Sequence, residues 1–109
     1  MKRSAQSKQH RSGEILYANQ RAREIFAMDH VAGRFSSDPV WQMVDEEGQP
    51  VPGDQHPSMR SLRTGEPMRE VVRGLFAKDP GRTRWLLINT EPLLSEEGRA
   101  DEVLITFSD

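Results

Sequence analysis

The first half of the chain begins with a polar segment, after which apolar residues recur at regular spacing. In Met1–Ser12 only one apolar residue, Ala5, follows the first methionine. Ile15–Ala18 is a short run of residues that favour β-strands. In Gln20–Met28 apolar residues recur at helical spacing, and Asn19 stands in the position of an N-cap. This half predicts a short strand followed by an amphipathic helix.

The second half predicts one helix and then three strands. The helix begins near Pro57, because proline is favoured in a first turn, and ends at Gly65, because glycine readily adopts the left-handed conformation that ends helices. The alternating strand period follows. Helices and antiparallel hairpins in this order predict an α+β fold with helices on one face of the sheet. The strands are Met68–Lys78, Thr83–Leu94 and Glu102–Phe107, joined by polar turns at 79–81 and 95–99.

Composition indicates one small domain without a nucleic-acid partner. The 109 residues suffice for one modest core, and 29% of them are charged. The net charge of −2 argues against a nucleic-acid binder, which normally carries a basic face. Only Met1–Ser12 is basic, as is typical of a solvated terminus.

The absence of cysteine and of long apolar runs narrows the chemistry and the location. Without cysteine, disulfides and thiol chemistry are excluded. No apolar run approaches the roughly 20 residues of a membrane span, and no secretory signal is visible. We therefore expect a soluble, cytoplasmic domain without direct membrane insertion.

No residue pattern is typical of catalysis or of metal binding. His10, His30 and His56 are scattered without ligand spacing. The acidic runs Asp45–Glu47 and Glu96–Glu97 lie in predicted turns, and no phosphate loop or nucleophile motif is present. We predict no catalytic residue, no metal site and no enzyme activity, so that any catalytic output would lie in a domain outside this chain.

Several short motifs follow one another in a characteristic order. They are Gly13–Asn19 (GEILYAN), Trp41, Asp45–Gly48, His56-Pro57, Leu62–Pro67, Arg84–Leu93 (RWLLINTEPL) and Val103–Asp109 (VLITFSD). Their order and spacing resemble a PAS domain, the sensor fold of bacterial signalling proteins. The resemblance covers residues 13–109 and implies an antiparallel five-stranded sheet with helices packed on one face. Residues 1–12 depart from it, because the family's first strand is usually apolar, and the sequence leaves open whether they form that strand or swap onto a neighbour.

The resemblance also implies a ligand pocket on one face of the sheet. Alternate residues of a strand share a face. The resemblance to flavin-binding relatives implies that Leu86, Ile88 and Thr90 face the pocket. On the neighbouring strand the missing side chain of Gly74 would leave space for a ligand. The same residues can instead simply pack the core. The full predicted pocket is Ile25, Phe26, Leu62, Val72, Gly74, Phe76, Leu86, Ile88, Thr90, Val103, Ile105 and Phe107.

The same comparison predicts no cofactor. A covalent flavin needs a cysteine, and the amides that would hold a flavin are replaced by Leu86 and Phe107. A haem-binding relative needs a histidine on the helix that ends at Gly65. His56 lies at the start of that helix, where helix capping or solvent exposure is expected.

The outward residues of the same strand are Trp85, Leu87 and Asn89. Exposed apolar groups there favour a protein contact, and in PAS-like domains this face is commonly a dimer surface, so we expect a homodimer. Alternatively, Trp85 covers the aliphatic stems of neighbouring arginines. Arg69 and Arg73 are predicted on the outer polar face of the adjacent strand.

Two functions stay open at this point. In the first, the chain is a sensory or regulatory module of a larger signalling protein, of histidine kinase or cyclic-dinucleotide synthase or hydrolase type. It then binds a small apolar ligand, with hydrogen bonds from Thr90 or Ser61, and relays the signal through its C-terminal end. In the second, the pocket is filled by its own side chains, and the chain is a ligand-free dimerisation or protein-interaction module using the outer sheet face.

Overall fold

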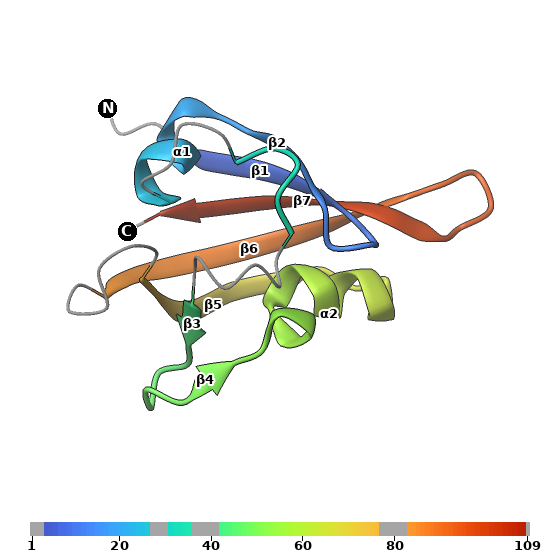
Figure 1. Cartoon of the computed structure of the whole chain (residues 1–109). Coiled ribbons are helices and arrows are strands. Elements are labelled where there is room, and N and C mark those ends of the chain that lie inside the picture. The colour runs from blue at the N-terminus through green and yellow to red at the C-terminus, as the bar shows by residue number, and fades with distance from the viewer. Residues whose placement is uncertain (1–3, 27–30, 36–41, 77–82, 109) are drawn as a thin grey trace.

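A computed structural model describes residues 4–26, 31–35, 42–76 and 83–108, without the side chain of Phe76. Its single sheet has the strand order β2-β1-β7-β6-β5-β3-β4, and every pairing is antiparallel (Figure 1). The α+β class is confirmed. The elements are β1 (Ala5–His10), β2 (Ile15–Ala18), α1 (Gln20–Phe26), β3 (Gln42–Val44), β4 (Pro50–Val51), a 3-10 helix (Gly53–Gln55), α2 (Pro57–Thr64), β5 (Met68–Phe76), β6 (Arg84–Leu94) and β7 (Ala100–Ser108).

The sheet has seven strands instead of the expected five. The additional strands are β3 and β4, which have three and two residues. Segments this short do not contain enough alternating positions to give a periodic signal.

The polar N-terminal segment contributes strand β1 to the interior of the sheet. One edge of β1 pairs with β7, from Ala5 opposite Phe107 to His10 opposite Glu102, and the other edge pairs with β2. Along β1, Ala5, Ser7 and Gln9 are buried and their neighbours are partly exposed. The strand period is therefore present, but small and polar residues occupy its inward positions, so that hydropathy alone does not reveal it.

Both helices begin at the predicted residues. Asn19 caps α1, because its Oδ1 accepts the N–H of Ala22 at 2.9 Å, and the same atom accepts the N–H of Gln6 at 3.0 Å. The predicted end of this helix at Met28 lies outside the described residues. Helix α2 ends at Gly65, which has the left-handed φ of 72° and donates its N–H to the Ser61 carbonyl.

The helices pack on the same face of the sheet and enclose a small core (Figure 1). Ala22 and Ile25 of α1 join this core, and the rings of Phe26 and Phe107 have centroids 5.3 Å apart. No helix of the described segments is long and apolar enough to cross a membrane. The buried core cluster is Ala5, Ile15, Ala18, Ala22, Ile25, Val31, Leu75, Leu86, Ile88 and Phe107.

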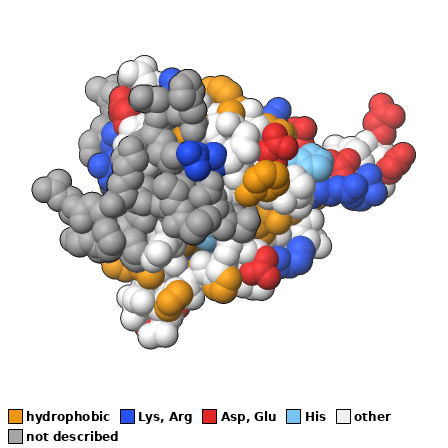
Figure 2. Space-filling view, in the orientation of Figure 1, with side chains coloured by type: hydrophobic (Ala, Val, Ile, Leu, Met, Phe, Trp, Pro, Cys, Tyr) orange, Lys and Arg blue, Asp and Glu red, His pale blue; other side chains and the backbone are white. Residues whose placement is uncertain are grey.

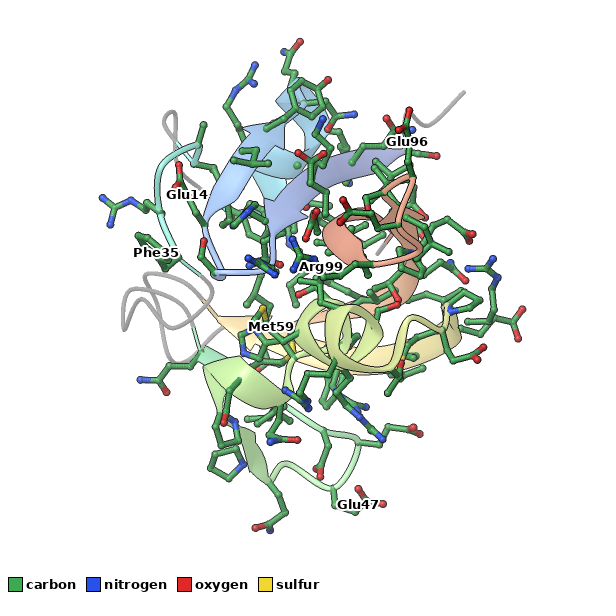
Figure 3. All side chains as sticks on the ribbon, turned by 90° about the vertical axis from the view of Figure 1, so that its right-hand side faces the viewer. Glu14, Phe35, Glu47, Met59, Glu96 and Arg99 are labelled. Atoms are coloured by element: carbon green, nitrogen blue, oxygen red, sulfur yellow. The ribbon has the colours of Figure 1, made fainter. Side chains whose placement is uncertain are left out.

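The β6–β7 hairpin projects from the body and carries charged side chains of both signs at its tip (Figure 2). Its turn lies at 95–99 as predicted, and Ser95 donates its N–H to the Arg99 carbonyl at 2.8 Å. Glu96 and Arg99 lie on this turn (Figure 3). The predicted turn at 79–81 lies outside the part of the chain that the structure describes.

Residues 31–35 lie alongside β2. Phe35 forms a bridge with Glu14, and Figure 3 shows the two residues on the same edge of the molecule. Ile15 donates its N–H to the Arg34 carbonyl at 2.7 Å, and Val31 is 1% exposed. This segment therefore closes the core beside β2.

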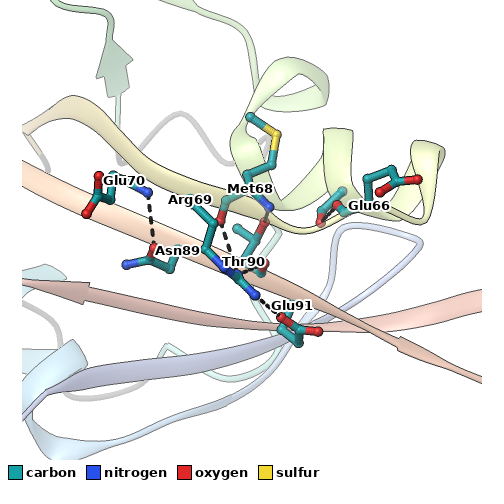
Figure 4. Close-up of polar contacts among 8 residues, drawn as sticks. Glu66, Met68, Arg69, Glu70, Asn89, Thr90 and Glu91 are labelled. Atoms are coloured by element: carbon teal, nitrogen blue, oxygen red, sulfur yellow. Dashed lines mark hydrogen bonds and ion pairs between the residues drawn. The ribbon is translucent and has the colours of Figure 1, made fainter.

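A bulge in β5 controls which of its side chains face the helices. The pairing with β6 shifts between Met68 and Val71, and Glu70 in this bulge has a φ of 54°. The Asn89 side chain stabilises the bulge, because its Oδ1 accepts the Glu70 N–H at 3.0 Å (Figure 4). Asn89, predicted for a partner contact, thus has an intramolecular role.

We predict that Glu70→Gly stabilises the fold. A left-handed conformation costs a non-glycine residue about 1–2 kcal/mol, and the greater freedom of glycine in the unfolded chain offsets part of the gain. The free energy of unfolding, measured by urea denaturation, should rise by about 0.5–1 kcal/mol. The matched change Glu102→Gly in β7, where φ is ordinary, should lower it by a similar amount. A lower free energy of unfolding in Glu70→Gly would contradict the prediction that the backbone of Glu70 is strained.

Candidate functional site

A cavity lies between the inner face of the sheet and the beginning of α2. Its volume is about 80 Å³. That is several times the roughly 10–15 Å³ that one water needs and smaller than the about 150 Å³ of an apolar cavity that takes up benzene. The lining residues are Ser7, Gln9, Ile15, Phe26, Met43, His56, Pro57, Ser58, Leu75, Leu86, Ile88, Ile105 and Phe107.

The apolar part of the wall comes from the alternation of the central strands. Leu86 and Ile88 of β6 are 3% and 5% exposed, and the register places Phe107 of β7 opposite Ile88. Met43 of β3 pairs with Leu75 of β5 and continues the same face. These side chains give the cavity a largely hydrophobic floor, as ligand pockets usually have.

Polar groups reach the cavity from β1 and from the start of α2. Ser7 and Gln9 belong to β1, and His56 and Ser58 to the start of α2, and all four are buried. Gln9 donates from Nε2 to the Gly13 carbonyl at 2.8 Å. A few polar groups on an apolar wall are the arrangement by which pockets orient a ligand.

His56 is a buried imidazole whose pKa lies below its ordinary value. Burial lowers its pKa from 6.5, a hydrogen bond to the Val51 backbone opposes this, the Arg73 charge lowers the pKa further and Asp54 raises it. Burial contradicts the predicted solvent exposure, and the side chain makes no capping hydrogen bond to α2. The proline that follows allows the helix to start without such a bond, which frees the imidazole to face the cavity.

Arg73 lies on the inner face of β5, which corrects its predicted outward position. It pairs with Leu86, and paired residues of antiparallel strands share a face. Its Nη1 donates to the Val72 carbonyl at 2.8 Å, while its Nε is buried without a hydrogen-bond partner. The guanidinium is thus close enough to His56 to influence it, but Arg73 does not line the cavity.

The structure brings together some of the predicted pocket residues. Phe26, Leu86, Ile88, Ile105 and Phe107 line the cavity. Ile25, Thr90 and Val103 are buried elsewhere, and Leu62 is half-buried. The side chain of Phe76 is outside the described set.

Val72 and Gly74 lie on the opposite face of the sheet from the one predicted. Their partners are Leu87 and Trp85, which point outward, because the bulge inserts residues that shift the alternation of β5. The missing Gly74 side chain leaves no ligand space. A Cβ there would lie 2.9 Å from Val44 Cγ2 and 3.2 Å from the Trp85 ring, so the glycine permits close packing on the outer face.

The hydroxyls predicted to bind a ligand are used elsewhere. Thr90 Oγ1 accepts the Met68 N–H at 3.1 Å, and Ser61 Oγ donates to the Glu66 carbonyl (Figure 4). Neither residue lines the cavity.

Sequence reasoning missed the polar lining. Ser7 and Gln9 carry a weak signal, since they alternate with partly exposed residues and follow Ala5 at the same period. His56 carries none, because its burial results from packing against distant strands. Also missed were Ile15, Met43, Pro57, Ser58 and Leu75.

The outer face of the central strands exposes two large apolar side chains. Trp85 is 47% exposed and Leu87 is 40% exposed. Both belong to β6 and alternate with the cavity residues Leu86 and Ile88. Across the described segments no group of three histidine, aspartate or glutamate side chains could hold a metal ion.

Comparison with solved structures identifies the type of fold. The PAS domain of nitrogen regulation protein NR(II) from Vibrio parahaemolyticus is similar over 97% of this chain and 88% of its own, with a TM-score of 0.68 and 15% identity. The PAS domain of the histidine kinase ThkA is similar over 97% and 98%, with a TM-score of 0.63 and 20% identity. The light-state dimer of the fungal blue-light photoreceptor Vivid matches over 97% and 77%, with a TM-score of 0.68 and 15% identity. At these identities the likeness establishes the fold.

The sequence itself establishes the family. The family model described as the PAS fold matches residues 10–109. The chain therefore belongs to the PAS family. A search of the curated proteins finds no match.

We predict that His56 makes the stability of the fold depend on pH. Its pKa is lower in the folded than in the unfolded protein, so the unfolded chain binds the proton more readily. The folded state should therefore keep its full stability above about pH 6.5 and lose it as the pH falls below that value. Urea denaturation between about pH 7 and pH 5 should show a shallower loss in His56→Gln than in the wild type.

The control for this prediction is His10→Gln, which removes a histidine from β1 that does not line the cavity. Its pH dependence should follow the wild type. An unchanged slope in His56→Gln would contradict the assignment.

Proposed function

We propose that the chain is a sensory or regulatory PAS domain of a larger cytoplasmic signalling protein, and that it binds a small, largely apolar molecule in the cavity. The output would be of histidine kinase or cyclic-dinucleotide synthase or hydrolase type, and any catalysis would lie outside this chain. The observation that carries the proposal is the partly open cavity with polar groups on a hydrophobic wall. The similarity to the PAS domain of the kinase ThkA supports this kind of output.

The position of the cavity suggests how binding would be relayed. Ile105 and Phe107 line it from β7, whose last described residue is Ser108. A ligand that prefers one position of β7 would shift the population toward it and displace the C-terminal end of the chain. The signal would leave the domain there.

Filling the cavity should abolish binding while the fold persists. Ile105→Phe adds volume on the cavity side of β7, and Leu104→Phe makes the equivalent change on the opposite side of the same strand. We expect small neutral compounds to perturb the amide resonances of wild-type and Leu104→Phe protein near the cavity, with at least a tenfold weaker effect in Ile105→Phe. Native mass spectrometry of freshly purified protein would reveal a retained ligand. If no compound perturbs these resonances in the wild type, the proposal fails.

A second function is supported by the exposed outer face of β6. Here the domain would work by dimerising through Trp85 and Leu87, as a ligand-free interaction module. The exposure of these two residues favours this reading, since large apolar groups side by side on a surface often mark contacts. The dimer named for Vivid supports self-association on this fold.

Trp85→Glu should dissociate such a dimer. A charge in an apolar interface loses its hydration without gaining a partner, so the dissociation constant should rise at least tenfold in sedimentation equilibrium. Phe35→Glu, at a residue 43% exposed outside the sheet strands, is the control and should leave the mass unchanged. A wild-type protein that stays monomeric at high concentration would exclude this function.

A further inference from the structure

The polar groups of the cavity are unequal in what they offer a ligand. No lysine, arginine, aspartate or glutamate is among its described lining residues. Its polar groups are an amide, an imidazole and two hydroxyls, from Gln9, His56, Ser7 and Ser58. The hydrogen bonds that the Gln9 amide and the His56 imidazole already make determine whether each can still donate to a ligand or accept from it.

The Gln9 amide presents an acceptor. Its Nε2 donates to the Gly13 carbonyl at 2.8 Å, and because a carbonyl oxygen can only accept, this bond fixes which end of the amide is nitrogen. No residue in the described segments donates to the Gln9 Oε1. Gln9 is 3% exposed, but its Oε1 is not among the described side-chain atoms that are fully buried without a partner, so the oxygen keeps some accessible surface beside the partly open cavity. A donor in the cavity, from water or from a ligand, can therefore satisfy it.

His56 presents a second acceptor. A backbone hydrogen bond with Val51 raises the pKa of the ring, which is the effect of a bond that a ring N–H donates. Burial and the nearby Arg73 charge lower the pKa and so favour the neutral ring, against the opposing effects of the Val51 bond and of Asp54. A neutral imidazole that donates from one nitrogen accepts at the other.

We infer that the cavity takes a small, neutral molecule with an apolar body and at least one hydrogen-bond donor, such as a hydroxyl, that satisfies the acceptors of Gln9 and His56. This inference rests on the proposed function and names the class of ligand. The hydroxyls of Ser7 and Ser58 can donate or accept, so they are compatible with a ligand oxygen that also accepts.

Other classes of ligand fit less well. An ammonium group would be buried without an anionic partner among the described lining residues, and burial of an unpaired charge is very unfavourable. A carboxylate would meet no cation in the lining either, because Arg73 lies near His56 on the inner face but does not line the cavity. A carbonyl compound without a donor would leave both acceptors unsatisfied, as would a hydrocarbon.

A set of probes of equal size tests this inference. 2-Butanol, 2-butanone and propionate each have five non-hydrogen atoms, and they differ in being a donor, an acceptor only and an anion. Dissociation constants would come from amide chemical-shift titration of the whole chain at neutral pH. We expect 2-butanol to bind about fivefold more tightly than the other two, since one hydrogen bond is worth about that factor.

Gln9→Leu should remove most of this preference. Gln6→Leu makes the same change on the other face of β1 and should retain it. Thermal unfolding of both variants checks that they fold. If Gln9→Leu does not fold, the ranking of the probes in the wild type still tests the inference. Equal or tighter binding of 2-butanone or propionate would overturn the inference and leave the proposed function intact. Binding of none of the probes would count against the proposed function itself.

Discussion

The pairing of β1 with β7 is the interaction on which the rest of the structure depends. It joins the two ends of the chain, from Ala5 opposite Phe107 to His10 opposite Glu102. Without it the sheet would divide into β2-β1 on one side and β7-β6-β5-β3-β4 on the other. Because the paired residues are nearly a chain length apart, their contact carries a large loop-closure cost. The same pairing fixes the register that turns Ser7 and Gln9 toward the helices, and so it creates the polar side of the cavity.

Much of the architecture could be predicted from local sequence, and the exceptions have identifiable causes. The ends of α2 follow from Pro57 and Gly65, and the inward set Leu86 and Ile88 follows from the alternation of β6. The face of β5 could not be predicted in this way, because the bulge at Glu70 reverses every later side chain and depends on Asn89, 19 residues away. The position of His56 likewise results from packing against distant strands.

The polar inward residues of β1 stabilise the fold less than apolar residues would at the same positions, and this indicates a functional role for them. Large apolar side chains at Ser7 and Gln9 would fill the space between the sheet and α2 and would not need hydrogen bonds. The fold instead retains a cavity and buries an amide and an imidazole beside it. Places where a sequence departs from what its own fold favours are commonly functional sites. The strained Glu70 is a different case, because its hydrogen bond to Asn89 accounts for it within the fold.

The two candidate functions use opposite faces of the same strands. On β6 the cavity residue Leu86 is followed by the exposed Leu87, and on β7 Ile105 alternates with Leu104. A close-packed strand moves as a unit, so a displacement that accommodates a ligand on one face also moves the other face. A ligand with different affinities for two positions of these strands would therefore bias a contact made through Trp85 and Leu87. Ligand binding and self-association would then be coupled, because both would depend on the position of the same strands, and they would not be alternatives.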